Sequence, residues 1–344
     1  MVINNILVVK LSAIGDVIHA LPVSYALKET FPQAKVSWVV EPPAYDLLTN
    51  NPYIDEIILF EKKKFKSFGG LIKNLPSFSS LIKQKKYDVC LDLQGLGKSA
   101  AIAYLSGAKI KLGTCNMREG SHLISKKVCG KNQYGHIVER YLDVARALGC
   151  KTREIKFPIV TTPKEEELTA LIAKQVGMSL ANPYVVLAVG ANWPNKRWNP
   201  KFYTELVNYL YDKNITPVII GGNSDQYLFE EIAKHSKILP VNLVGKTTLK
   251  QLAVIIKNSK ALIGGDTGPM HLAAGLGKPT IALMGPTDAN RNGPYQQSEN
   301  AIEINRDCKY CWKRSCSLGL DCLADIKVEQ VITKLKKHLK GEKY

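Results

Sequence analysis

The 344-residue chain lacks the features of an exported or membrane-spanning protein. Its first ten residues, MVINNILVVK, contain no basic segment before the apolar run and no small-residue cleavage site. Lys10 and Asp16 interrupt this run well short of the roughly 20 apolar residues that cross a bilayer as a helix. These absences predict a cytoplasmic protein without a signal peptide or a transmembrane segment.

Acidic residues are scarce relative to basic ones. The chain has 47 Lys and Arg against 30 Asp and Glu, which gives a net charge of +17. Lysines cluster at 62–66 and 83–86. No nucleic-acid-binding motif accompanies this charge, so nucleic acid is not an expected partner. A polyanionic substrate or an anionic lipid surface fits the charge better, and a solvated basic surface is the simpler alternative.

Cysteines follow no standard metal-binding or disulfide pattern. Four of the eight (Cys90, Cys115, Cys129 and Cys150) are scattered, which predicts reduced thiols. The other four (Cys308, Cys311, Cys316 and Cys322) lie within fifteen residues, but their spacings match no pair of Cys-x2-Cys knuckles. They either hold a metal ion or remain free thiols.

Apolar strand-like runs alternate with helical patterns along the whole chain, and one of these helical patterns falls near 75–86. The runs fall at 6–10, 36–40, 54–60, 89–93 and 110–113, and again at 184–189, 216–220, 241–244, 261–263 and 280–284. The pattern pauses at two prolines in 157–164. Alternation of this kind predicts parallel sheets covered by helices, so we expect two doubly wound α/β domains, 1–160 and 161–344.

The first strand-to-helix turn lacks the Gly-x-Gly-x-x-Gly pattern of dinucleotide-binding folds, since only Gly15 is present. Asp16 instead stands at the start of the helix. This carboxylate is either a helix N-cap or a general base that takes a proton from an acceptor hydroxyl. His19, one turn later, either orients a substrate or packs in the core.

Three loops after strands of the second domain carry groups suited to a nucleotide. Lys196 follows the strand ending near residue 189 and is expected to face a diphosphate as a point charge. Asp225 is a candidate partner for a ribose hydroxyl, and Lys246 and Thr247 for an adenine pocket. The alternative for the Lys196 loop is a solvated basic loop.

A fourth loop, within 264–286, has the composition of a phosphate seat. Gly265 and Gly268 allow close backbone approach to a ligand, and a helix beginning at Pro269 directs free N–H groups toward the turn. Asp266 then orders the turn or bonds a sugar hydroxyl. The alternative is an ordinary strand-turn-helix junction capped by Asp266 or Thr267.

Six motifs together resemble a known enzyme family. They are Leu11–Pro22 (LSAIGDVIHALP), Trp38–Glu41 (WVVE), Asp92–Ser99 (DLQGLGKS), His136–Arg140 (HIVER), Lys196–Trp198 (KRW) and Asp266–His271 (DTGPMH). This set resembles the ADP-heptose:lipopolysaccharide heptosyltransferases of glycosyltransferase family 9 along nearly the whole chain. The first domain is most similar to heptosyltransferase I.

The resemblance implies a GT-B fold, with two Rossmann-like domains facing an interdomain cleft. Domain 1–160 would bind the acceptor, and domain 161–344, with a Cys-rich segment at 308–322 and a terminal helix, the ADP-sugar. The implied reaction is inverting transfer of heptose from ADP-heptose to the Kdo region of the lipopolysaccharide inner core, without metal or cofactor. Asp16 would be the general base.

The resemblance and the loop analysis together assign candidate residues to each substrate. The donor-binding set is Asn192, Lys196, Asp225, Lys246, Thr247, Asp266, Thr267, Gly268 and His271. The acceptor-binding set is Ser12, His19, Lys98, Arg118, His136 and Arg140. Cations in the second set suit the Kdo carboxylates and phosphates of Kdo-lipid A, which predicts peripheral association with the inner membrane.

Two features leave the exact substrate pair open. Ala191 and Asn192 stand where heptosyltransferase I relatives carry hydroxyl residues, and the cysteine cluster is similar to branches nearer heptosyltransferase II. The alternatives are therefore another nucleotide sugar, another anionic acceptor including that of the heptosyltransferase II step, or a non-catalytic binding protein.

Overall fold

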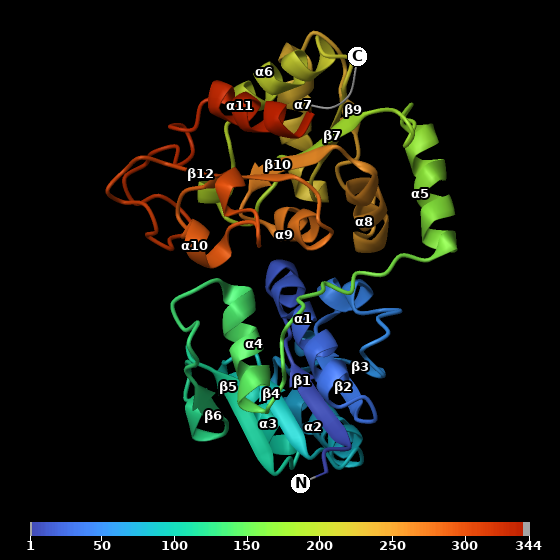
Figure 1. Cartoon of the computed structure of the whole chain (residues 1–344), viewed down its shortest axis with the longest axis vertical. Coiled ribbons are helices and arrows are strands. Elements are labelled where there is room, and N and C mark those ends of the chain that lie inside the picture. The colour runs from blue at the N-terminus through green and yellow to red at the C-terminus, as the bar shows by residue number, and fades with distance from the viewer. Residues whose placement is uncertain (1, 340–344) are drawn as a thin grey trace. The chain divides into compact units, whose positions relative to one another are not determined.

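The computed structural model describes residues 2–339, and the chain forms two compact units (Figure 1). One unit ends at Val160 and the other begins at Thr161. Each contains a six-stranded, fully parallel sheet covered by helices, so the predicted α/β class with two doubly wound sheets is confirmed. Residues 340–344, the end of the predicted second domain, lie outside the described residues.

The first unit runs through six strands and four α-helices. In chain order they are β1 (Asn5–Val9), α1 (Ile14–Thr30), β2 (Lys35–Val40), β3 (Glu56–Leu59), α2 (Phe68–Lys83), β4 (Val89–Asp92), α3 (Gly97–Leu105), β5 (Ile110–Thr114), β6 (Lys126–Val128) and α4 (Ile137–Ala147). The strand order is β3-β2-β1-β4-β5-β6. Helix α1 packs beside α4, and α2 beside α3.

The second unit repeats this plan. Its elements are α5 (Pro163–Gln175), β7 (Tyr184–Ala188), α6 (Pro200–Tyr211), β8 (Thr216–Ile220), α7 (Gln226–His235), β9 (Val241–Asn242), α8 (Leu249–Asn258), β10 (Ala261–Gly265), α9 (Gly268–Gly275), β11 (Thr280–Met284), α10 (Ala289–Asn292), β12 (Ala301–Glu303) and α11 (Val328–Leu339). The strand order is β12-β11-β10-β7-β8-β9, which is the same topology.

The strand order places one topological switch point in each sheet. In the first unit the strand order changes direction between β1 and β4, and in the second between β7 and β10, while all strands stay parallel. Connections on either side of such a point lead to opposite faces of the sheet, which leaves a crevice at the carboxyl ends of the two strands. The loops after these four strands are therefore the expected places for ligands.

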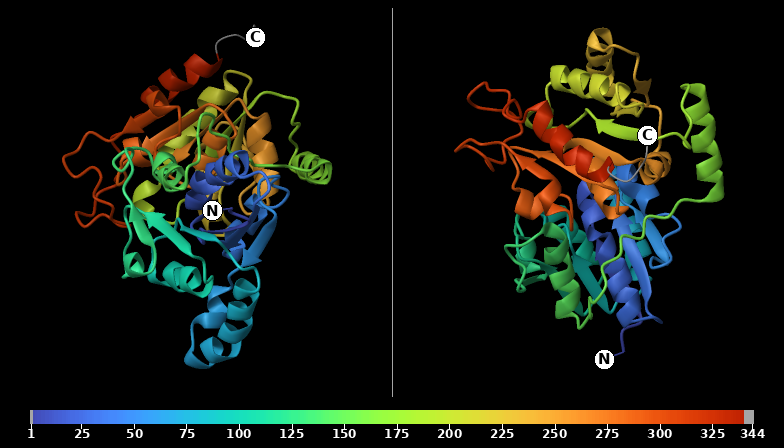
Figure 2. Two further views of the ribbon diagram at one scale, coloured as in Figure 1. Left: turned by 60° about the horizontal axis from the view of Figure 1, so that its bottom comes forward. Right: turned by 45° about the horizontal axis from the view of Figure 1, so that its top comes forward.

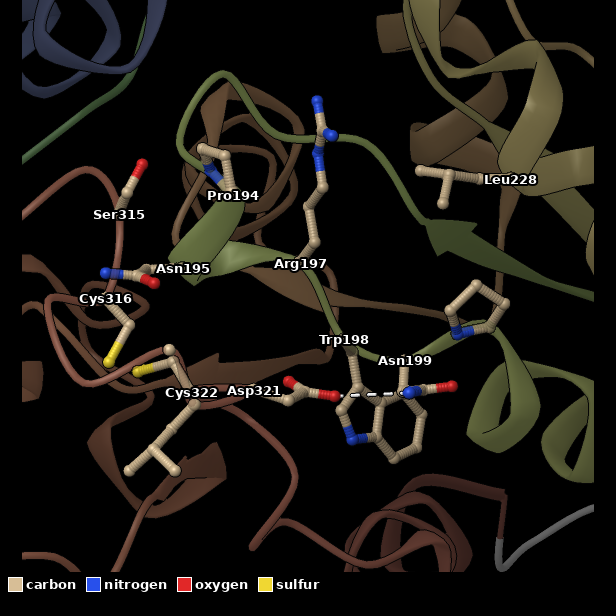
Figure 3. Close-up of a pocket in the computed structure, with 13 residues that line it drawn as sticks. Pro194, Asn195, Arg197, Trp198, Asn199, Leu228, Ser315, Cys316, Asp321 and Cys322 are labelled. Carbon is tan, nitrogen blue, oxygen red and sulfur yellow. Dashed lines mark hydrogen bonds between the residues drawn. The ribbon is translucent and has the colours of Figure 1, made fainter.

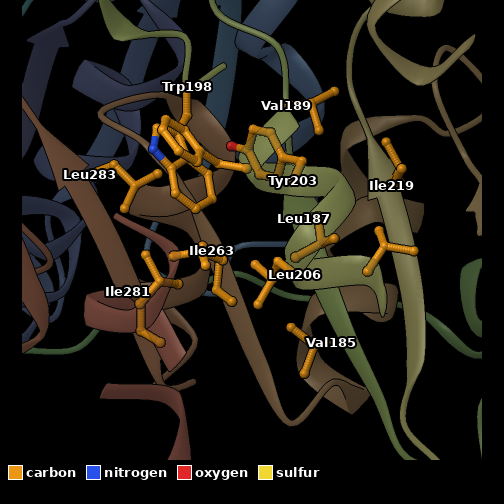
Figure 4. Packing of buried hydrophobic residues seen from close by; sticks show 14 of the residues in the cluster. Val185, Leu187, Val189, Trp198, Tyr203, Leu206, Ile219, Ile263, Ile281 and Leu283 are labelled. Carbon is orange, nitrogen blue, oxygen red and sulfur yellow. The ribbon is translucent and has the colours of Figure 1, made fainter. Parts of the chain in front are cut away.

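The central strands have continuous apolar sequences because they lie in the hydrophobic cores. Every residue of β7 and β10 is buried, because helices cover both faces of the sheet. Trp198 and Tyr203 extend this core from the loop before α6 and from α6 itself (Figure 4). Their polar atoms are paired, since Trp198 Nε1 donates to the Ile326 carbonyl at 2.9 Å and the Tyr203 hydroxyl to the Ala188 carbonyl at 2.9 Å.

Several elements differ from the sequence prediction. Strands β6 and β12 were not predicted, because each has three residues and no room for a recognisable apolar period. Helix α2 begins at Phe68 rather than near residue 75. Ser67 is its N-cap and accepts a hydrogen bond from the Gly70 N–H at 3.1 Å, a signal that the neighbouring glycines and Pro76 masked.

The prediction that Cys115 and Cys129 are reduced thiols is wrong. They form a disulfide with a Cα–Cα distance of 4.6 Å. The reason is the register of β5 and β6, in which Thr114 lies opposite Val128. Cys115 and Cys129 directly follow these two residues and therefore lie side by side. Cys90 and Cys150 are free thiols, as predicted, and both are buried.

Among residues 2–339, no helix is both long enough and apolar enough to span a bilayer.

Candidate active site

The loop after β1 is attached to the loop after β4 at the first switch point. The backbone N–H groups of Leu11 and Ser12 both donate to Gln94 Oε1, at 3.1 and 3.2 Å. Ser12, a predicted acceptor-binding residue, is half-buried there. One amide side chain thus holds the turn that leads into α1.

Asp16 lies in the first turn of α1 and is partly exposed. The interpretation of Asp16 as an N-cap is wrong, since the helix begins at Ile14 and its N-cap is Ala13. Asp16 Oδ2 accepts a hydrogen bond from the Ala13 N–H at 3.1 Å. Its Oδ1 accepts none from residues 2–339, so this oxygen is available to take a proton from a ligand.

Lys10 is a buried cation close to this carboxylate, and the sequence analysis missed it. Its Nζ donates to the Tyr141 hydroxyl at 2.8 Å and to the Leu93 carbonyl at 3.2 Å. Burial acts to lower the pKa of Lys10, but interactions with Tyr141, Asp16 and Asp92 outweigh it, and the net shift is upward. Lys10 therefore remains charged beneath the turn.

Lys98, a predicted acceptor-binding cation, is already paired. It is the second residue of α3, and its Nζ lies 2.6 Å from Glu41 Oε1. Glu41 is buried and also lies 3.5 Å from Lys62 Nζ. Arg118 is exposed on the β5–β6 connection, and its backbone N–H donates to the Gly95 carbonyl at 2.8 Å. An anionic ligand would have to compete with Glu41 for Lys98 but meets Arg118 directly.

His19, His136 and Arg140 gather where α1 packs on α4. His19 is 3 % exposed, and its ring lies edge-on to that of His136 with centroids 5.6 Å apart. His136 is the N-cap of α4, and its Nδ1 accepts from the Val138 N–H at 3.2 Å. Arg140 Nε donates to the Gly135 carbonyl at 2.8 Å. The structure thus shows His19 packed, with the two other residues one turn apart beside it.

At the second switch point, Asp266 is the centre of a buried polar cluster. Asp266 Oδ2 lies 2.6 Å from Lys196 Nζ and accepts from the Thr287 hydroxyl at 2.6 Å, and Oδ1 lies 2.8 Å from His271 Nε2. Burial acts to raise the pKa of Asp266, but His271 and Lys196 outweigh it and hold the pKa well below its usual range. Asp266 is therefore an anion that positions a cation.

Lys196 is held from two sides, with its side chain 14 % exposed. Its Nζ also lies 4.6 Å from the centre of the Trp193 ring. The sequence suggested that Gly265 makes room for a ligand, but in the structure it makes room for the Lys196 loop. A Cβ at this position would lie 2.1 Å from the Lys196 carbonyl oxygen. Because Gly265 has no side chain, the Lys196 loop packs directly against the loop after β10.

The first residues of α9 complete this corner of the second sheet. Thr267 is the N-cap, and its hydroxyl donates to the Gly265 carbonyl at 3.3 Å instead of accepting from the helix. Helix α9 begins at Gly268, with Pro269 second. Its first N–H groups therefore remain available to an anion, as at other helix N-termini.

The remaining donor candidates differ in accessibility. Asn192 and Lys246 are exposed, and Thr247 is half-buried just before the N-cap of α8. Asp225 is 6 % exposed, accepts from the Gly222 N–H at 2.8 Å and lies 3.6 Å from Arg197 Nη2. Its carboxylate therefore already supports the loop after β8.

A pocket of about 350 Å³ separates the Lys196 loop from the Cys-rich segment (Figure 3). Asn195 donates to the Lys313 carbonyl at 3.0 Å, and Asn199 to Asp321 Oδ2 at 3.2 Å. Cys316 and Cys322 both line it as free thiols. Burial raises the pKa of Cys322 to about 11. Within residues 2–339 no group of three or more His, Cys, Asp or Glu side chains is arranged to hold a metal ion.

Comparison with known proteins decides the family. The model of glycosyltransferase family 9 (heptosyltransferase) matches residues 77–320, which is more than half of the chain. The chain belongs to glycosyltransferase family 9. It is therefore a glycosyltransferase, and the resemblance noted in its motifs is confirmed.

Relatives of this family member align over nearly its full length. It is 26 % identical to the lipopolysaccharide core heptosyltransferase OpsX of Haemophilus influenzae, covering 97 % of this chain and 96 % of that protein. It is also 26 % identical to lipopolysaccharide heptosyltransferase 2 of Salmonella typhimurium, covering 98 % and 99 %. The family 9 structure from Veillonella parvula has a TM-score of 0.86 at 24 % identity, covering 98 % of each chain, and shares the GT-B architecture.

Two site residues escaped the sequence analysis for different reasons. Lys10 had a signal, because a lysine at the end of a fully apolar strand must find a partner when it is buried. Thr287 had none, since a threonine after a strand is common. Only the adjacency of β10 and β11 brings it to Asp266.

Proposed function

We propose that this family 9 glycosyltransferase transfers heptose from ADP-heptose to the Kdo region of the lipopolysaccharide inner core, with Kdo-lipid A as acceptor. The observation that carries the proposal is the Asp266-centred cluster, which fixes Lys196 beside the N-terminus of α9 at a topological switch point. A positioned cation together with backbone N–H groups at a helix N-terminus stabilises a diphosphate.

The donor half of the mechanism follows from charge. As the bond between the anomeric carbon and ADP breaks, negative charge develops on the diphosphate. Lys196 and the Gly268 N–H at the start of α9 would neutralise it. Thr267 and His271 hold this corner in place, and Asn192, Asp225, Lys246 and Thr247 are proposed to contact the rest of the nucleotide sugar.

The acceptor half depends on Asp16. Its Oδ1 would take the proton of an acceptor hydroxyl as that oxygen attacks the anomeric carbon from the side opposite ADP, so the configuration inverts and the proton ends on the carboxylate. Lys10 keeps positive charge beneath the turn throughout. The role of Asp16 as general base is supported by its hydrogen bonding, since only Oδ2 accepts a hydrogen bond from the described residues.

The acceptor is proposed to be anionic and lipid-anchored. Lys98, Arg118, His136 and Arg140 would bind Kdo carboxylates and lipid A phosphates, with Ser12 and His19 supporting the loop and helix that carry them. Such an acceptor would place the protein peripherally on the cytoplasmic face of the inner membrane. The net charge of +17 supports this partner.

A second candidate is the heptosyltransferase II step, with a heptosylated core as acceptor. It is favoured by the match to the Salmonella relative, whose identity equals that of OpsX. The two candidates differ in the acceptor alone, so they are separated by offering Kdo-lipid A with and without one heptose.

The test is transfer itself, followed by mass spectrometry of the lipid. Incubation with ADP-heptose and Kdo-lipid A is expected to add one heptose-sized mass and release ADP. Asp16→Asn is expected to bind ADP-heptose as the parent does but to lose transfer by about 10² or more. Asp46→Asn, in the same unit but outside the site, is the matched control. Equal rates for the parent and Asp16→Asn would exclude the base assignment.

A further inference from the structure

Helix α2 carries an apolar stripe that the first unit leaves uncovered. Phe68, Leu71, Ile72 and Leu75 follow the i, i+3, i+4, i+7 spacing of one helix face. Their exposed fractions are 80, 39, 60 and 37 %. Single exposed apolar residues need no explanation, but four in succession on one face of a helix mark an interaction surface.

The stripe is presented by a firmly attached helix. Phe78, on the C-terminal half of α2, is buried against Phe60 and Phe65, with ring centroids 5.5 and 5.7 Å away. Asn74 Nδ2 donates to the Lys64 carbonyl at 3.1 Å, which attaches the short 3-10 helix Lys62–Phe65 to α2. The N-terminal half, which carries the stripe, extends past this anchor, and the light-blue segment projects beyond its own sheet (Figure 2, left).

The stretch of chain that carries the stripe is rich in lysine. Residues 62–86 contain eight lysines and no aspartate or glutamate. Lys62, Lys64 and Lys85 have carboxylate partners from outside this stretch, Glu41, Glu61 and Glu56. In the part of the chain that the structure describes, Lys63, Lys66 and Lys73 have none within 4 Å, and all three are exposed. Apolar side chains bordered by unpaired lysines complement a bilayer surface of anionic headgroups over acyl chains.

We infer that α2 and Lys62–Phe65 form the surface by which this protein docks on an anionic membrane, with Phe68 and Ile72 entering the acyl boundary and Lys63, Lys66 and Lys73 contacting headgroup phosphates. The inference deepens the proposed function and rests on it, because a lipid-anchored acceptor requires the enzyme to work at a bilayer. A single interfacial helix gives reversible binding.

The test is sedimentation of the full chain with phosphatidylcholine vesicles, with and without phosphatidylglycerol. The parent is expected to bind the vesicles that contain phosphatidylglycerol and not the neutral ones. Phe68→Ser/Ile72→Ser is expected to lower the partition coefficient about ten-fold or more, and Lys63→Glu/Lys66→Glu to lower it similarly. Leu171→Ser/Leu239→Ser removes two residues of similar exposure, 52 and 76 %, from the second unit and is expected to change nothing.

Three results would overturn the inference. One is equal binding of the parent to neutral and anionic vesicles, and another is unchanged binding of Phe68→Ser/Ile72→Ser. The third is that Phe68→Ser/Ile72→Ser keeps vesicle binding but loses self-association, as measured by sedimentation velocity. That result would show that the stripe is a contact between copies of the chain.

Activity separates this inference from the proposed function. With a Kdo acceptor that lacks acyl chains, Phe68→Ser/Ile72→Ser is expected to transfer heptose at the parental rate, which also shows that it folds. With vesicle-embedded acceptor its rate is expected to fall with its binding. If the parent transfers heptose to neither acceptor, the proposed function fails, whereas the vesicle-binding result still decides the docking surface.

Discussion

At the scale of single residues, Asp266 is the side chain on which the position of Lys196 depends. It is 4 % exposed and pairs with Lys196 and His271 while accepting a hydrogen bond from Thr287. Removing one member of a buried ion pair costs more than the pair itself contributes, because the other charge stays buried without a partner. Asp266 thus couples stability to the position of Lys196.

We expect Asp266→Asn to lower the free energy of unfolding by about 3 kcal/mol near neutral pH. The pKa of Asp266 is lowered in the folded state, so its stabilisation is complete above the unfolded pKa and is lost as pH falls toward the folded value. The difference in unfolding free energy between the parent and the variant should therefore shrink as pH falls below about 4. Urea unfolding at several pH values measures this.

Asp143→Asn is the matched control for that variant. Asp143 is 3 % exposed and paired with Arg146 at 2.8 Å, but it lies in the first unit. Both variants should lose stability, and only Asp266→Asn should also weaken ADP-heptose binding, because it releases Lys196. If the two variants bind the donor equally well, the positioning role of Asp266 is wrong.

At the scale of elements, the loop after β7 and the β10–α9 junction act as one piece. Gly265 permits this, because its bare Cα faces the Lys196 carbonyl. The motif at 266–271 was recognisable from its sequence, since a glycine-rich turn and a proline at a helix start are local signals. The contact with Lys196 was not recognisable, because it joins residues 70 positions apart.

We expect Gly265→Ala to push the Lys196 loop away from α9. A Cβ at this position would lie 2.1 Å from a backbone oxygen, which no rotamer change relieves. The variant should lose about 2 kcal/mol of stability and bind ADP-heptose about ten-fold more weakly. Gly69→Ala, where nothing lies within 4 Å, is the control and should bind the donor normally. Calorimetric titration with ADP-heptose measures both, and parental affinity in Gly265→Ala would contradict the argument.

The connection between β5 and β6 shows the same limit of sequence reasoning. Scattered cysteines favoured reduced thiols, yet Cys115 and Cys129 are bonded because strand register places them side by side. The bond closes the loop that carries Arg118. Register depends on which strands are neighbours, which the spacing of two cysteines does not reveal.

At the scale of the whole molecule, the net charge of +17 bears on association more than on fold. Exposed cations such as Arg118 would attract the proposed anionic acceptor at long range and are screened by salt, with a Debye length of about 10 Å at 0.1 M. Lys196 and Asp266 are largely buried, so their interaction is screened much less.

We therefore expect the two substrates to respond differently to salt. Between about 0.05 and 0.5 M NaCl, the KM for the anionic acceptor should rise about ten-fold, while the KM for ADP-heptose and kcat change little. Steady-state kinetics with an acceptor that lacks acyl chains excludes effects on membrane binding. An acceptor KM that stays constant over this range would remove the role assigned to the exposed cations.

The sequence by itself determined the two parallel α/β units, the family and the loops that carry Asp16, Lys196 and Asp266. These are local properties: apolar runs identify strands buried on both faces, and glycine, proline and aspartate mark the turns between strand and helix. Tertiary structure alone decided which side chains meet. The pairing of Lys10 with Tyr141, of Thr287 with Asp266 and of Cys115 with Cys129 depends on strand order and register, because these place residues distant in the chain side by side.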